Sequence, residues 1–117
     1  MGLRAAEWAA LLPLSTLPKA SSRAVLSILA VRSNDPGYAA YPSITTMSTA
    51  LGVTRRTVQR ACAELLAAGL IREGEADAVR HMRADRRPKV YDVLTHELLS
   101  AERQKAERAQ SRQVGAV

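Results

Sequence analysis

Hydrophobic residues recur at three- and four-residue spacing in three stretches of the chain, residues 19–32, 43–51 and 54–68. That periodicity places the apolar side chains of each stretch on one side of a helix, so it predicts three amphipathic helices. Their apolar stripes are Val25, Leu26, Ile28 and Leu29; Ile44, Met47, Ala50 and Leu51; and Val58, Ala61, Cys62 and Leu65. Three stripes of this kind can bury one another, which predicts a three-helix core.

The residues that flank the second and third stretches are typical of helix ends. Ser43 and Thr54 precede them, and a hydroxyl at such a position accepts a hydrogen bond from an unpaired backbone N–H group. Gly52 and Gly69 follow them and can adopt the left-handed conformation that ends a helix. Since only Gly52 and Val53 separate a two-turn helix from a longer one, the segment predicts a helix-turn-helix.

Two short strands are predicted after the third helix, at residues 70–73 and 90–94, where Tyr91 alternates with valines. A hairpin in this place is a wing. The predicted fold class is therefore mostly α with a small β-hairpin: a winged helix-turn-helix with a three-helix core, a two-stranded wing and helical extensions at both ends. The loop between the strands, residues 74–89, is long for a hairpin, and we expect it to lack order when no partner is bound.

The chain is predicted to divide into three units: a helical arm at residues 1–17, the winged domain at 18–94 and a final helix at 95–117. The sole tryptophan, Trp8, lies in the arm. It either packs the arm onto the domain or contributes to a dimer contact.

The connections at the two ends of the winged domain are less regular. A dense turn signal at residues 33–37 is followed by Tyr38 and Tyr41, which either pack over the core or donate hydroxyls to a partner.

Thr95 can cap the final helix. Its apolar stripe fades after Leu99, so we expect the helix to fray beyond about Arg108.

Composition favours a polyanionic partner, because the net charge is +6 and the pI is about 10.2. A membrane surface is the competing polyanion. No apolar run approaches the roughly 20 residues needed to span a bilayer, and no secretion signal is evident, so we expect a cytoplasmic protein. A chain of 117 residues leaves no room for a small-molecule effector domain beside the winged domain.

Arginines in the first turn of the third helix indicate where that polyanion binds. Arg55 and Arg56 lie at the positive end of the helix dipole, where a cation costs roughly 0.3 to 1 kcal/mol. An external phosphate would offset that cost, because helix N-termini and arginines both bind phosphate. The alternative is that these arginines are only solvated side chains on an exposed face.

Several segments of the helix-turn-helix carry a family resemblance: Pro42-Ser43, Leu51-Gly52-Val53-Thr54-Arg55, Thr57-Val58 and Gly69-Leu70-Ile71. They resemble the winged helix-turn-helix of GntR-type regulators, which implies a DNA-binding domain. The wing lacks the glycine-rich pattern of that family. Its long basic loop closing in Lys89-Val90-Tyr91-Asp92-Val93 is more similar to small helix-turn-helix proteins of phages, plasmids and other mobile elements.

Three sets of residues are predicted to contact double-stranded DNA. Base edges would face Arg56, Gln59 and Arg60, because arginine suits the acceptors of guanine and glutamine can pair with adenine. Phosphates would be held by Ser43, Thr45, Thr54, Arg55 and Thr57. The wing would reach the backbone or the minor groove through Arg80, Arg83, Arg86, Arg87 and Lys89. For the wing, the alternative is a loop whose charge only keeps it soluble.

Catalytic chemistry is not predicted. His81, His96 and Cys62 do not have the spacing of a metal site, and no phosphate-binding loop, dinucleotide motif or nucleophile elbow is present. We therefore expect no metal, no cofactor and no enzymatic activity. Cys62 lies on the apolar side of its helix and is most simply a core residue.

The predicted function is sequence-specific binding of double-stranded DNA by a bacterial transcriptional regulator from a plasmid, phage or other mobile element. A homodimer on DNA is the expected assembly. One alternative keeps the same surface but assigns it to plasmid replication, segregation or transfer. Another, from a different class, is a winged-helix protein-interaction module whose arginines meet an acidic partner.

Overall fold

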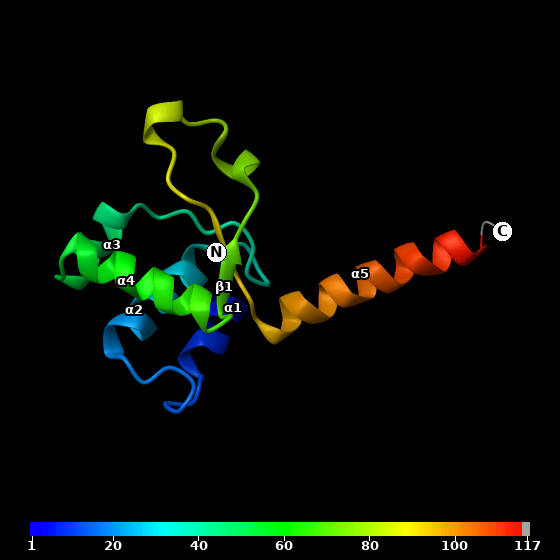
Figure 1. Ribbon diagram of the computed structural model, residues 1–117, viewed down its shortest axis with the longest axis horizontal. Coiled ribbons are helices and arrows are strands. Elements are labelled where there is room, and N and C mark those ends of the chain that lie inside the picture. Colours follow the sequence, from blue (N-terminus) through cyan, green and yellow to red (C-terminus); the bar gives the residue numbers. More distant parts are fainter. Residues whose placement is uncertain (116–117) are drawn as a thin grey trace.

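The computed structural model describes the backbone of residues 1–115 and the side chains of residues 1–111. Within that range the chain forms five α-helices and two strands (Figure 1). Their bounds are α1 Leu3–Ala10, α2 Ala20–Arg32, α3 Ile44–Leu51, α4 Arg55–Ala67, β1 Ile71–Glu73, β2 Tyr91–Val93 and α5 His96–Gly115. The mostly helical composition and the antiparallel β1–β2 pair confirm the predicted winged helix-turn-helix.

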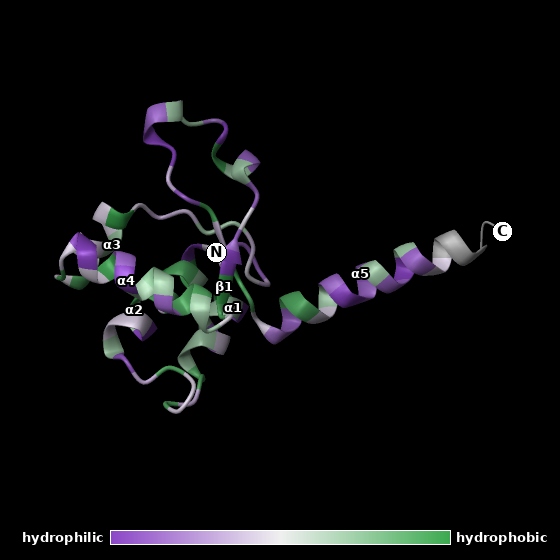
Figure 2. Ribbon diagram, in the orientation of Figure 1, coloured by the Kyte–Doolittle hydropathy of each residue, from purple (hydrophilic) through white to green (hydrophobic). Residues whose placement is uncertain are grey.

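The core forms where the predicted apolar stripes meet. Val25 and Leu29 of α2 are fully buried, as are Val58 and Leu65 of α4 and Met47 of α3. Burying a side chain of this size stabilises the fold by roughly 1.5 to 3 kcal/mol. In Figure 2 α4 shows green apolar segments toward the centre of the domain, whereas the loop between β1 and β2 mixes purple and green, and purple and green alternate along the coloured part of α5.

The predicted caps are confirmed. The Ser43 hydroxyl accepts a hydrogen bond from the Thr46 N–H group at 3.0 Å, and the Thr54 hydroxyl accepts one from the Thr57 N–H group at 3.2 Å. Gly52 ends α3 in the left-handed region with φ 67°. These local interactions set the turn between α3 and α4, and therefore the direction in which α4 leaves it.

The sheet has a neighbour that the sequence did not indicate. Ile71 pairs with Val93 and Glu73 with Tyr91 in the β1–β2 register. On the other side of β2, Ala40 and Tyr91 exchange two backbone hydrogen bonds of 2.8 Å. The segment after α2 is therefore a turn, as predicted, but it then continues along β2 as a short extended neighbour.

The N-terminal arm is fixed to the domain. Asp35 accepts hydrogen bonds from the backbone N–H groups of Arg4 and Ala5, at 3.0 and 3.1 Å, and so caps α1 from the loop after α2. Burial alone would raise the pKa of Asp35, but these two N–H groups and the Arg4 cation bring it below its usual value. Trp8 packs against the core, which agrees with the first of its two predicted roles.

Helix α5 begins on the domain and then projects away from it (Figure 1). Thr95 caps it by accepting a hydrogen bond from the Leu98 N–H group at 3.0 Å, and Leu98 is fully buried. The backbone stays helical to Gly115, so the predicted fraying beyond about Arg108 is not seen as far as that residue. The last two residues of the expected frayed end lie outside the described range.

One charged network attaches α5 to the wing. The Arg72 guanidinium of β1 donates two hydrogen bonds of 2.7 Å to the Glu102 carboxylate of α5 and one of 3.0 Å to Asp92 of β2. Asp92 also accepts a hydrogen bond from the Ala39 N–H group at 3.0 Å. Two parallel hydrogen bonds fix the relative orientation of the guanidinium and the carboxylate and also pair their charges. They therefore fix the first part of α5 against the sheet.

The hydrogen bonds from Arg72 are the largest cause that lowers the pKa of Glu102 below its usual 4.5. Since the folded pKa is lowered, the stabilisation from Glu102 is fully present above pH 4.5 and is lost as the pH falls through the folded pKa. The free energy of unfolding, measured by urea denaturation at pH 7 and pH 3, should therefore fall further for the wild type than for Glu102→Gln. Glu107→Gln, on the exposed part of the same helix, should behave like the wild type; an equal fall in all three proteins would contradict the role of this ion pair.

Candidate nucleic-acid interface

The outer face of α4 carries its arginines in solvent. Arg55, Arg56 and Arg60 are exposed, and within the described side chains none of them forms an ion pair. The nearest carboxylate along the helix, Glu64, is engaged elsewhere: it accepts hydrogen bonds of 2.6 Å from Lys19 and from Ser22 of α2. These two bonds, with the Lys19 bond the larger, lower the pKa of Glu64. The charge of Arg60 also lowers the pKa of Glu64, but less than these bonds do. Without an ion pair of their own, Arg55, Arg56 and Arg60 are open to an external anion.

The predicted phosphate-contacting residues lie at the two helix starts. Thr54 and Arg55 open α4, and the hydroxyls of Thr54 and Thr57 are 2.9 Å apart. Thr45 is exposed in the first turn of α3, next to the capping Ser43. The Ser43 hydroxyl accepts the capping bond and donates to the Thr46 hydroxyl at 2.8 Å, so it has only a lone pair left for a ligand. The Thr54 hydroxyl is likewise used as a cap and paired with that of Thr57.

The loop between β1 and β2 has an internal structure that the charge pattern did not predict. It contains two 3₁₀ turns, η1 at Ala76–Val79 and η2 at Ala84–Arg86, and Val79 is buried. The Arg87 guanidinium donates to the carbonyls of Met82 at 2.9 Å and of Arg80 at 2.8 Å. Arg87 therefore holds the loop together, a role its place in a basic run did not reveal.

The other cations of the loop differ in their partners. Arg83 lies 3.5 Å from Asp85, and Lys89 lies 3.4 Å from Glu73. Arg80 and Arg86 form no ion pair within the described part of the chain. Of the five predicted wing contacts, these two guanidinium groups are the ones that remain available.

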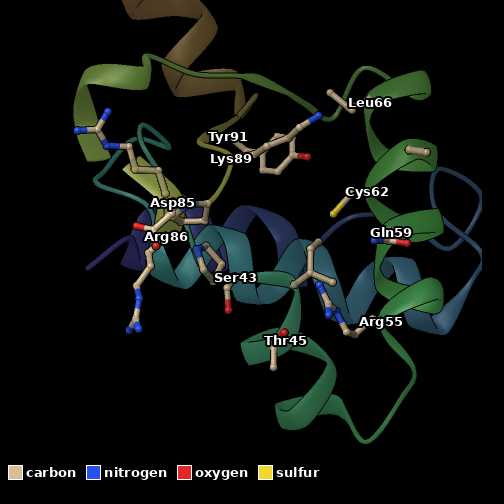
Figure 3. Close-up of a pocket in the computed structure, with 15 residues that line it drawn as sticks. Ser43, Thr45, Arg55, Gln59, Cys62, Leu66, Asp85, Arg86, Lys89 and Tyr91 are labelled. Carbon is tan, nitrogen blue, oxygen red and sulfur yellow. The ribbon is translucent and has the colours of Figure 1, made fainter. Parts of the chain in front are cut away.

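A groove of about 520 Å³ separates α4 from the loop (Figure 3). From α4 it is lined by Arg55, Gln59, Cys62, Ala63 and Leu66; from the start of α3 by Pro42, Ser43, Ile44 and Thr45; and from the wing by Asp85, Arg86, Arg87, Pro88, Lys89 and Tyr91. Figure 3 shows Arg55 and Gln59 extending from α4 toward the loop side. Arg56 and Arg60 are not among the lining residues, so α4 presents two different polar stripes.

The groove brings together residues from each of the three predicted sets: Gln59 of the base-reading set, Ser43, Thr45 and Arg55 of the phosphate set, and Arg86, Arg87 and Lys89 of the wing set. It also contains apolar residues that the sequence did not assign to a site. Burial raises the pKa of the Cys62 thiol and of the Tyr91 hydroxyl, so both are protonated at neutral pH. Cys62 and Tyr91 could have been assigned to the groove from their positions on α4 and β2, the two elements that face the basic loop.

Comparison with known proteins concerns the central part of the chain. Residues 19–71 match a family model described as a helix-turn-helix domain. The match runs from the N-cap of α2 to the first residue of β1 and covers less than half of the 117 residues. No curated protein and no solved structure matches the chain. The helix-turn-helix is therefore supported by sequence and by structure alike, and such a domain suggests a DNA partner.

Other kinds of site find little support in the described residues. Nowhere between residues 1 and 115 do three or more His, Cys, Asp or Glu side chains gather as metal ligands would. None of the helices in that range is both long and apolar enough to cross a bilayer.

The role of Arg87 can be tested in the free protein. Arg87→Ala removes two hydrogen bonds to loop carbonyls, so the backbone amides of residues 76–88 should exchange with solvent roughly fivefold faster or more, as measured by hydrogen exchange. Arg86→Ala is the matched control, because its side chain makes no hydrogen bond within the described residues. Equal exchange rates in the two variants would show that Arg87 does not organise the loop.

Proposed function

We propose that this protein binds double-stranded DNA in a sequence-specific manner and acts as a bacterial transcriptional regulator, encoded by a plasmid, a phage or another mobile element. The observation that carries the proposal is the exposed side of α4, where Arg55, Arg56 and Arg60 have no internal carboxylate partner. An α-helix fits the major groove, and these cations would meet its phosphates and base edges.

The energetics of α4 support an anionic partner. Two arginines in the first turn of a helix are unfavourable by roughly 0.3 to 1 kcal/mol each, and no acidic residue occupies that turn to compensate. Bound phosphate would turn this local cost into a gain, since each neutralised phosphate also releases a counterion. If these arginines were only solvated, nothing would offset the unfavourable interaction of their charges with the helix dipole.

Different residues are assigned different tasks. Arg56 and Arg60 would read base edges from the outer face of α4, and Gln59 from the neighbouring stripe that lines the groove. Thr54, Arg55 and Thr57, with Ser43 and Thr45 at the start of α3, would hold the flanking phosphates. Arg80 and Arg86 would carry the wing contact, supported by Arg83 and Lys89, while Arg87 shapes the loop that presents them.

A homodimer fits this function. Two copies related by a two-fold axis would place two α4 helices on half-sites about one helical turn, 34 to 36 Å, apart.

The base-reading role is tested on a site obtained by selecting bound fragments from genomic DNA. On that site Arg60→Ala and Gln59→Ala should each lose roughly 1 to 3 kcal/mol of binding free energy and relax the preference at one or two base pairs. Arg103→Ala, which removes a cation from the projecting α5, is the matched control and should bind like the wild type in fluorescence anisotropy. Equal losses on selected and random DNA would reject base reading by the altered residue.

The wing is expected to contribute without sequence preference. The double variant Arg80→Ala, Arg86→Ala should weaken binding to selected and random duplexes alike. If each arginine neutralises one phosphate, the slope of log K against log salt should become shallower by about 1.8. Anisotropy titrations between 0.05 and 0.2 M salt, a range of roughly fourfold, would measure it. An unchanged slope would assign the loop arginines to solvation alone.

A further inference from the structure

Helix α1 buries its small apolar residues and exposes its large ones. Ala5 and Ala9 are buried against the rest of the domain, whereas Leu3 and Leu11 are 66% and 74% exposed. An amphipathic helix that packs on one domain alone ordinarily has its large apolar side chains on the buried side. Leu3 and Leu11 are eight residues apart, so they lie within about 80° of each other around α1 and about 12 Å apart along it. They form one apolar ridge that the described residues leave largely uncovered.

The close packing of α1 on α2 explains this orientation. The Gly2 N–H group donates to the Val31 carbonyl at 3.0 Å, and a Cβ on Gly2 would overlap the Ala30 carbonyl oxygen. At the other end of α1, the Arg23 guanidinium of α2 donates to the Leu12 carbonyl at 2.8 Å. Leucine side chains placed between helices this close would force them apart, because protein interiors have little spare volume. The exposure of the α1 leucines is therefore a consequence of this contact.

Five of the seven large hydrophobic side chains that are exposed within the described range lie on α1, on α2 or next to α1 in the chain. Because Gly2 is bonded to Val31, its neighbours Met1 and Leu3 lie at the end of α2. The five residues, termed the α1–α2 face, are Met1, Leu3, Leu11, Leu14 and Val31. A single exposed leucine is ordinary, but a cluster of this size on one pair of helices marks an interaction surface.

The charges around the α1–α2 face indicate what kind of partner it fits. Arg4 pairs with carboxylates of the loop after α2 and of α5, Lys19 pairs with one on α4, and Arg23 donates to backbone carbonyls. Arg32 and Glu7 are the charged side chains of α1 and α2 that form no ion pair with another described residue. An anionic membrane or a nucleic acid would require several available cations. One available charge of each sign suits a self-complementary contact instead.

We propose that the α1–α2 face binds the same face of a second copy of this chain. A two-fold axis makes such a contact self-complementary, and it allows Glu7 of each copy to meet Arg32 of the partner subunit. The five side chains expose on the order of 400 Å² of apolar surface in each copy. The apolar share of a standard interface is roughly 450 Å² of about 800 Å² per partner. The area is therefore sufficient for a dimer of moderate affinity.

The dimer leaves α4 open to DNA. Helix α2 packs against both α1 and α4, and the exposed arginines of α4 lie on the side of that helix opposite to its buried residues. Both surfaces can therefore be occupied at the same time. Formation of the dimer does not depend on the proposed function; only its effect on DNA binding rests on that function.

The dimer is tested by sedimentation equilibrium of the full-length protein without DNA, at about 0.15 M salt and from about 1 to 200 µM protein. The wild type should show a dissociation constant on the order of 10 µM. Leu3→Glu and Leu11→Lys each introduce a charge that suits its end of the α1 dipole, so the circular dichroism and Tm should stay unchanged. Both variants should weaken the dimer roughly thirtyfold or more. A wild type that stays monomeric, or variants that dimerise equally well, would overturn the proposal.

The matched control is Leu99→Gln, which removes an exposed leucine of α5 outside the α1–α2 face and should dimerise like the wild type. Loss of the dimer in Leu99→Gln but not in Leu3→Glu would assign the association to α5 and overturn the proposal. Monomeric protein that co-sediments with phosphatidylglycerol vesicles, and no longer does so in Leu3→Glu, would assign the face to a lipid surface with the same consequence.

The register of the dimer is tested by exchanging charges. Glu7→Arg and Arg32→Glu should each weaken dimerisation roughly tenfold, because each places like charges opposite each other in both halves of the contact. The double variant restores opposite charges, so its dissociation constant should lie within about threefold of the wild type. Two single losses that simply add in the double variant would refute the pairing of Glu7 with Arg32 of the partner subunit.

The effect on DNA binding is measured with selected fragments that contain one or two half-sites. Leu3→Glu should bind a single half-site within about twofold of the wild type and two half-sites roughly tenfold more weakly, because it loses the affinity that comes from linking two α4 helices. Equal affinity of the two proteins for two half-sites would show that the dimer plays no part in DNA binding. If the wild type dimerises through the α1–α2 face and binds no DNA, the proposed function fails and the dimer stands.

Discussion

Burial of one side of α4 against α2 is the constraint on which the rest of the molecule depends. Val58 and Leu65 are fully buried against a core that includes Val25 and Leu29. A helix with 3.6 residues per turn cannot bury these positions without turning the opposite stripe, Arg56 and Arg60 among it, into solvent. The orientation of the candidate recognition face is therefore a consequence of core packing. The caps at Ser43 and Thr54 then fix where along the chain that face begins.

The features that the sequence predicted well are local ones. Helix periodicity, the two hydroxyl caps and the glycine ends involve residues within a few positions of each other, so their spacing is readable directly. The features it missed join residues far apart. Asp35 caps a helix that begins thirty-two residues earlier, and Arg72 meets Glu102 thirty residues later. A carboxylate in a turn or on a helix carries no local sign of which distant N–H group or cation it will meet, and the same is true of the pairing between Ala40 and Tyr91.

The placement of acidic residues explains why the arginines of α4 form no ion pair within the described side chains. Asp35, Glu64, Asp92 and Glu102 each bind groups from another element, so they are used to hold α1, α2, the sheet and α5 in place. Arg60 contributes through its charge to the lowered pKa of Glu64, but no α4 arginine forms an ion pair with a carboxylate of the described side chains. A net charge of +6 alone says only that a polyanion is favoured. Cations without an ion pair among the described side chains also occur on α2 and α5, so the argument for a site comes from the three arginines that share the exposed part of α4 within the helix-turn-helix.

Strand β2 relates the groove to the attachment of α5. Successive side chains of a strand point to opposite faces, so Tyr91 faces the groove while the next residue, Asp92, faces Arg72 and the start of α5. The same strand is held on its two edges by Glu73 of β1 and by Ala40. Two separate elements, β1 and the segment at Ala40, therefore fix the backbone of Tyr91. The strand side of the groove is held by these backbone bonds, so the groove can change shape mainly through the loop that carries Arg86 and Pro88. The hydrogen bonds from Arg87 to the carbonyls of Met82 and Arg80 restrain the movement of that loop.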